Sequence, residues 1–145
     1  MALILDSGGL LVAIDPDQND HAAFADTLAS HRGPLVISPF VVAELDYMIA
    51  RDYGGDARLA FRLAFLDEVD RGAYRLEAFG AADFSRARTL MDAYSHLTGF
   101  GIADASNVVL AKRYDTTDIL TTDQRDFRRV ELSGGRHFRI LPYDL

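Results

Sequence analysis

Four acidic side chains stand where the sequence pattern predicts either a buried position or the end of a strand. They are Asp6, Glu44, Asp104 and Asp123. An unpaired buried carboxylate is costly, and of the basic residues only Arg125 stands close in sequence to any of the four. Mg²⁺ and Mn²⁺ prefer carboxylate oxygens and retain water molecules for chemistry. The residue types therefore predict a site for one of these cations, provided that the four side chains meet in space.

Each acid also has a structural role open to it when it is considered alone. Asp6 could cap the helix that follows it, and Asp123 could do the same for the next residues. Asp104 could favour the positive end of its helix, and Glu44 could pair with an arginine from elsewhere in the fold. The metal interpretation is favoured over four separate roles because helices that follow parallel strands would bring all four positions to one edge of a sheet.

The elements that must position these acids alternate between short apolar runs and helical patterns. Five runs predict strands, at 1–5, 35–37, 74–76, 118–121 and 138–141. The stretches that predict helices are 9–14, 20–31, 39–52, 56–70, 81–97, the segment around 105–111 and, as a short helix or turn, 124–130. Short apolar strands bounded by turn residues are typical of a sheet buried on both faces. The alternation predicts an α/β fold with a mostly parallel sheet.

Two helices carry apolar patterns that bear on function. In the helix 39–52 the apolar stripe includes Val41 and Met48, and Glu44 lies between them at helical spacing, so we expect Glu44 on the buried face. The helix 56–70 is apolar over an unusually wide arc, with two lines of Leu and Phe side chains. Such breadth predicts that one side meets the sheet while the other meets a second protein.

Length, cysteine content and charge limit the class of protein. At 145 residues the chain predicts a single domain that spans 1–145, and the absence of Cys excludes disulfides, thiolate nucleophiles and Cys-ligated metal sites. The net charge of −7 argues against a protein that holds nucleic acid by charge alone. No apolar run approaches the roughly 20 residues that span a bilayer. No basic leader precedes the first strand, so we expect a soluble, unexported protein with no membrane partner.

The ordered set of motifs resembles the PIN-domain proteins, and specifically the VapC toxins of bacterial toxin–antitoxin pairs. Those proteins present an apolar strand ending in Asp-Thr or Asp-Ser, a helix-borne glutamate, an Asp-Ala that opens a helix, and Thr-x-Asp with Asp-Phe three residues on. The matching segments are Leu5-Asp6-Ser7, Val42-Ala43-Glu44-Leu45, Ile102-Ala103-Asp104-Ala105, Thr121-Thr122-Asp123 and Asp126-Phe127. Each motif alone is weak, whereas the ordered set is specific and covers nearly the whole chain. One departure is Gly8, where relatives often carry Ser or Asn, and with Gly9 it could loosen the first helix.

The resemblance implies a PIN-like three-layer fold with a central five-stranded parallel sheet flanked by helices, and endoribonuclease activity that depends on Mg²⁺ or Mn²⁺. It implies that Asp6, Asp104 and Asp123 bind the metal, with Glu44 nearby through water as the fourth catalytic acid. It also implies three supporting residues, Ser7, Thr121 and Asp126. Ser7 and Thr121 would orient the metal ligands by hydrogen bonds.

As a VapC-like toxin, the protein would act in the cytoplasm on an RNA substrate, form a homodimer and bind a cognate VapB-type antitoxin. We expect the antitoxin, or a second copy of the chain, to cover an apolar face around Tyr47, Met48, Phe61 and Phe65. Basic side chains gather late in the chain. The arginines among them are candidates for RNA contacts, with a solvated surface role favoured for most: Arg113, Arg125, Arg128, Arg129, Arg136 and Arg139.

Two rival functions remain open from the sequence. A phosphatase that uses Asp6 as its nucleophile would need a second acid two residues later, where this chain has Gly8. A catalytically silent PIN-like module that binds RNA or protein would have no reason to keep four acids together without a metal ion. The metal-dependent nuclease is therefore the favoured interpretation.

Overall fold

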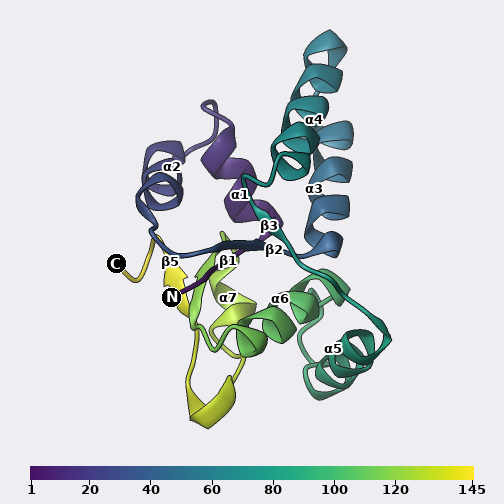
Figure 1. Cartoon of the computed structure of the whole chain (residues 1–145), viewed down its shortest axis with the longest axis vertical. Coiled ribbons are helices and arrows are strands. Elements are labelled where there is room, and N and C mark those ends of the chain that lie inside the picture. Colours follow the sequence, from purple (N-terminus) through teal and green to yellow (C-terminus); the bar gives the residue numbers. More distant parts are fainter.

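The computed structural model describes residues 1–145 and contains one five-stranded sheet between two layers of helices (Figure 1). All the strands are parallel, and they lie in the order β3-β2-β1-β4-β5. The strands are β1 (Leu3–Leu5), β2 (Leu35–Ile37), β3 (Arg75–Leu76), β4 (Asp118–Leu120) and β5 (Arg139–Leu141). The predicted α/β fold with a central parallel sheet is confirmed.

Seven α-helices connect and cover the strands. They are α1 (Ser7–Ile14), α2 (His21–Ser30), α3 (Pro39–Asp52), α4 (Gly55–Asp70), α5 (Ala81–Ala93), α6 (Ile102–Arg113) and α7 (Gln124–Phe127). The stretch 81–97, predicted as one helix, is helical only to Ala93 and continues as turns. None of the helices has the length and apolar character needed to cross a membrane.

Alternate side chains of β1 supply two separate cores. Leu3 and Leu5 pack on the side of the sheet covered by α1 to α4, together with Phe24 of α2. Ile4 packs on the opposite side with residues of α5, α6 and α7, including Phe127. Successive residues of a strand point to opposite faces, so a central strand between two helical layers must be apolar throughout. This explains the short, uninterrupted apolar run at the start of the chain.

Helix α1 begins directly after β1 and passes very close to the end of β4. A Cβ atom added at Gly9 would lie 2.4 Å from the carbonyl oxygen of Leu120 and 2.8 Å from the amide nitrogen of Thr121. Only glycine permits this approach. The expectation that the glycine pair loosens the first helix is therefore wrong for Gly9, because its missing side chain lets the helix pack tightly against the sheet.

Helices α3 and α4 lie side by side and extend away from the sheet (Figure 1). Both helices expose large apolar side chains, since Tyr47 of α3 and Leu59 and Leu63 of α4 are 64%, 58% and 56% exposed. Phe65 is only 3% exposed and belongs to the core, so its predicted place in a partner-binding face is wrong. Phe61 is half-buried and stacks on Tyr53, with ring centroids 5.0 Å apart.

Candidate active site

Asp6 follows β1 at the carboxyl edge of the sheet and is buried. It occupies the position before the first turn of α1, yet its side chain makes no capping hydrogen bond. Instead its Oδ1 accepts a hydrogen bond from Asn107 Nδ2 at 3.0 Å, and its Oδ2 accepts one from Thr121 Oγ1 at 2.6 Å. The carboxylate is therefore held by α6 and by the end of β4, and helix capping does not account for it.

The segment after β4 connects Asp6 to the predicted acid Asp123. The Thr121 hydroxyl that donates to Asp6 also accepts a hydrogen bond from the Asp123 backbone N–H at 3.0 Å. Asp123 Oδ1 accepts from the backbone N–H of Asp126 at 3.0 Å, so Asp123 does cap α7. Only one of its two carboxylate oxygens is used in this way. The Asp126 carboxylate lies towards Gly99, in the loop that leads to α6.

Asp104 lies in the first turn of α6, as predicted, and is half-buried. Its Oδ2 accepts a hydrogen bond from the backbone N–H of Gly101 at 2.9 Å. A carboxylate at a helix N-terminus is favoured by the helix dipole. Asp104 therefore does stabilise the N-terminus of α6, and it uses one of its two carboxylate oxygens to do so.

Glu44 is exposed, so its predicted place on the buried face of α3 is wrong. The buried residues of this helix are Val41, Leu45 and Ile49. At about 100° of rotation per residue, Glu44 lies roughly 100° from the centre of that stripe. Its Oε1 accepts a hydrogen bond from the Ser7 hydroxyl at the start of α1, and no arginine takes that place. Glu44 is thus held towards the carboxyl edge of the sheet while its side chain stays open to solvent.

The four acids act on one another electrostatically. The pKa of Asp6 is raised to about 6 and the pKa of Asp104 to about 7, and burial is the largest cause of both shifts. The negative charges of Glu44 and Asp123 contribute to the rise in both groups, and the charge of Asp6 contributes to the rise in Asp104. A hydrogen bond to each carboxylate opposes the rise only in part. The arrangement concentrates negative charge that no basic side chain of the protein balances.

The donor set suits a hard divalent cation, because all its members are carboxylates and a bound cation would offset the repulsion that contributes to the raised pKa values of Asp6 and Asp104. No three acidic or histidine side chains are already grouped tightly enough to hold a metal ion. Individual hydrogen bonds hold the carboxylates in their present orientations, as for Glu44 with Ser7 and Asp104 with Gly101. Chelation therefore requires the acidic side chains around Asp6 to rotate towards it.

Asn107 belongs to this site, although none of the sequence motifs includes it. It lies one turn after Asp104 on α6, is fully buried, and donates to Asp6. The signal that could have revealed it is a polar residue inside a helix whose neighbouring positions are small or apolar. Helix α6 buries residues around most of its circumference, which explains why its amphipathic pattern is weak.

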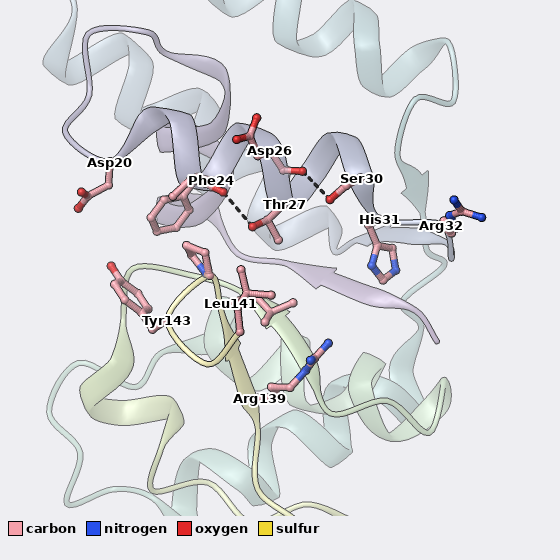
Figure 2. Close-up of a pocket in the computed structure, with 13 residues that line it drawn as sticks. Asp20, Phe24, Asp26, Thr27, Ser30, His31, Arg32, Arg139, Leu141 and Tyr143 are labelled. Atoms are coloured by element: carbon pink, nitrogen blue, oxygen red, sulfur yellow. Dashed lines mark hydrogen bonds between the residues drawn. The ribbon is translucent and has the colours of Figure 1, made fainter.

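The largest hollow on the molecule, of about 580 Å³, lies elsewhere and includes none of the four acids (Figure 2). Phe24 and Tyr143 lie at one end, and His31 and Arg139 lie towards the other. Several polar groups of its lining are used inside the protein. Thr27 and Ser30 donate to backbone carbonyls of α2, His31 Nε2 is hydrogen-bonded to the Met1 carbonyl, and Arg139 pairs with Asp118. Its size does not make this hollow the catalytic centre.

The fold and the site together define an α/β protein that gathers acidic side chains at the carboxyl edge of a parallel sheet. The chain belongs to the PIN-domain family, whose model matches residues 3–132. It is 43% identical over 140 residues to Ribonuclease VapC26 of Mycobacterium tuberculosis (strain ATCC 25618 / H37Rv), a match that covers 97% of this chain and 100% of that protein. The predicted family is confirmed.

Solved structures agree on the fold. The chain is similar to the Mycobacterium tuberculosis toxin VapC20, described as cleaving the sarcin–ricin loop, with a TM-score of 0.71, 14% identity, and coverage of 86% of this chain and 92% of that chain. It is also similar to FitAcB from Neisseria gonorrhoeae, with a TM-score of 0.56, 19% identity, and coverage of 81% and 84%. Both likenesses concern the three-layer architecture.

Proposed function

We propose that this PIN-domain protein is a metal-dependent endoribonuclease and the toxin of a toxin–antitoxin pair. The observation that carries the proposal is a hydrogen-bonded set of acids at the carboxyl edge of the sheet, in which Thr121 bonds Asp6 and the Asp123 backbone and Ser7 bonds Glu44. None of Asp6, Glu44, Asp104 and Asp123 forms an ion pair with a basic side chain. Its near full-length likeness to a ribonuclease supports the reaction class. An acidic protein can act on a polyanion when a cation is bound between the two.

In this proposal Asp6, Asp104 and Asp123 hold Mg²⁺ or Mn²⁺, and Glu44 lies beside them. The cation, when bound, supplies water activation, polarisation of the phosphodiester and charge neutralisation. Thr121 orients Asp6, and Ser7 orients Glu44 through Oε1. The exposed carboxylate of Glu44 keeps Oε2 free to accept a proton from the attacking water. In-line attack of water on phosphorus breaks the P–O3′ bond, so the expected products carry a 5′-phosphate and a 3′-hydroxyl.

Cleavage assays on purified protein test the proposal. We expect RNA cleavage in Mg²⁺ or Mn²⁺, loss of cleavage in EDTA, and a reduction of about 100-fold or more in Asp6→Asn, because a metal ligand is removed. Asp92→Asn is the matched control, since this acid pairs with Arg88 on the exposed side of α5. Equal cleavage by all variants in EDTA would indicate a contaminating nuclease and favour a catalytically silent binding module. RNA ends with 2′,3′-cyclic phosphate would exclude the attack by water.

The partners belong to the same proposal. The toxin would bind a VapB-type antitoxin and form a homodimer, and RNA would be its substrate. The exposed apolar side chains of the α3–α4 pair support a protein partner, because Tyr47, Leu59 and Leu63 are large and exposed and belong to two helices that project together from the sheet. Met48 is half-buried and remains part of the proposed surface.

A further inference from the structure

Asn107 and Thr121 lie on different elements and hydrogen-bond the two carboxylate oxygens of Asp6. Asn107 Nδ2, on α6, donates to Oδ1 at 3.0 Å, and Thr121 Oγ1, after β4, donates to Oδ2 at 2.6 Å. All three side chains are buried. A carboxylate held at both oxygens has little freedom to rotate, so its remaining lone pairs point in set directions.

The position of Asn107 is not explained by packing. Its Oδ1 is buried and has no hydrogen-bond partner, which costs free energy that an apolar side chain of similar size would not. Its neighbours Ala105, Val108 and Leu110 are buried in the core, as an apolar residue at this position would be. The single hydrogen bond that the amide makes is directed at Asp6. The residue therefore has a use at this site that outweighs the cost of the unpaired carbonyl.

The neutrality of the amide matters for a site that must attract a cation. An arginine at this position would orient Asp6 but would also cancel its charge, whereas an amide N–H orients it and leaves the charge in place. Arginines pair with acids at many other places in the protein, yet none forms an ion pair with Asp6, Glu44, Asp104 or Asp123. The chain thus keeps cationic donors away from the four carboxylates and supplies neutral ones.

We propose that Asn107 is a positioning residue for metal binding: its amide N–H fixes the orientation of the Asp6 carboxylate, so that Asp6 can serve as a ligand without reorganisation. The inference rests on the proposed function and concerns a residue outside the acidic quartet. It acts through Asp6 and has no direct contact with substrate. Hydrogen-bonding partners of metal ligands typically contribute 10- to 100-fold in affinity, which is about the scale expected here.

Calorimetric titration of the nuclease with Mn²⁺ tests this inference without any activity measurement. We expect Asn107→Leu to bind Mn²⁺ about 10- to 100-fold more weakly than wild type. Its thermal midpoint in EDTA should lie close to that of wild type, because the loss of the unpaired carbonyl is offset by the loss of the hydrogen bond to Asp6 Oδ1. Asn107→Ala, with a smaller side chain, is made in parallel in case Leu does not fit, and it should show the same loss of affinity.

Ser106→Ala is the matched control on the same helix. Ser106 is also fully buried, but its hydroxyl bonds Ser38 Oγ at 2.7 Å and the Ala103 carbonyl at 2.6 Å, and it contacts no acid of the site. Its replacement should lower the thermal midpoint and change the Mn²⁺ affinity by less than twofold. For Asn107→Leu we expect the opposite, a weaker Mn²⁺ affinity without a loss of thermal stability. The comparison therefore distinguishes a positioning role from a general loss of stability.

The outcomes separate the inference from the function on which it rests. If wild type binds Mn²⁺ and either Asn107 variant binds within twofold of it, the positioning role is overturned while the metal site stands. If wild type itself binds neither Mn²⁺ nor Mg²⁺, the proposed nuclease site fails and the inference fails with it. Weakened binding in both Asn107 variants with normal binding in Ser106→Ala supports the inference.

Discussion

At the scale of single residues, the candidate site works against the stability of the metal-free fold. Asp6 is buried and Asp104 is half-buried, and the pKa values of their carboxyl groups are raised to about 6 and about 7. A carboxyl group with a raised pKa binds its proton more tightly in the folded state than in the unfolded chain. The folded protein therefore loses stability when these groups ionise, and a bound cation would offset that loss.

The sign of this effect predicts a pH dependence. Between about pH 4 and pH 7 the folded state holds more protons than the unfolded state, so the free energy of unfolding decreases as pH rises through the folded-state pKa values. Asp104→Asn cannot ionise, and we expect it to raise the free energy of unfolding in EDTA by about 1–3 kcal/mol at pH 8, with little change at pH 4.5. Urea unfolding at the two pH values measures this difference. An equal effect of the substitution at both would contradict it.

The sequence predicted the placement of the acids better than their surroundings. Asp6 and Asp123 were predictable because short apolar runs mark the strands that they follow. The exposure of Glu44 was not, since its spacing from Val41 and Met48 places it near the apolar stripe but not within it. Asn107 required the structure, because its partner Asp6 lies 101 residues away along the chain.

At the scale of elements, the fold depends on a close approach of α1 to β4. This approach was not predictable from the local sequence, where two glycines suggested looseness. The backbone carbonyl of Leu120 leaves no room for a side chain at Gly9, whereas Gly8 would meet only the hydroxyl of Thr122. The two glycines are therefore unequal, and the second is the one that the packing requires.

Substitution of Gly9 tests that packing. We expect Gly9→Ala to lower the free energy of unfolding by about 1–3 kcal/mol, because its Cβ forces α1 away from the end of β4. Gly54→Ala is the control, since nothing lies within 4 Å of a Cβ at that position. Gly54 is the N-cap of α4, where alanine is less favourable than glycine, but the less flexible unfolded chain offsets this cost, so we expect a net change of only a few tenths of a kcal/mol. Chemical unfolding of both variants gives the comparison. Similar losses in the two proteins would argue against the close approach.

The α3–α4 pair is the element on which a protein partner would dock. Phe65 is not a suitable position for testing this surface, because it is buried in the core and its replacement would lower stability. We expect Leu59→Asp with Leu63→Asp to weaken binding of a co-expressed antitoxin, or the self-association of the toxin, by tenfold or more, which is about 1.4 kcal/mol. Both Leu side chains are exposed, so thermal stability should change little.

Phe84→Asp on α5 is the matched control for this surface, since Phe84 is also a large exposed apolar residue but lies on another helix. Copurification of each variant with the antitoxin measures antitoxin binding, and sedimentation measures self-association of the toxin. Loss of antitoxin with an unchanged oligomeric state assigns the surface to the antitoxin, and the converse assigns it to a second copy. If both properties persist in the double variant, the docking surface lies elsewhere.

At the scale of the whole molecule, a chain of net charge −7 must still approach RNA. Most of the late arginines cannot assist, because they are already paired with acids. Arg113 pairs with Glu77 and Asp83, Arg128 with Asp144, Arg136 with Asp115, and Arg139 with Asp118. Arg125 and Arg129 are exposed and form no ion pair, and their spacing puts them on one side of α7 and its continuation, directly after Asp123. They are the free positive charges closest in sequence to the site.

The difference between paired and unpaired arginines predicts different effects for Arg125 and Arg128, which are three residues apart. In an Asp6→Asn background, which prevents cleavage, we expect Arg125→Gln to weaken RNA binding at low salt and to reduce the slope of log affinity against log salt by about 0.7, the value for one phosphate contact on a single strand. Arg128→Gln should change neither quantity appreciably, because its charge is already balanced by Asp144. Fluorescence anisotropy with labelled RNA over a range of salt concentrations measures both. If the two variants lose affinity equally, RNA is held by the overall charge of the surface and not by the unpaired side chain beside the acids.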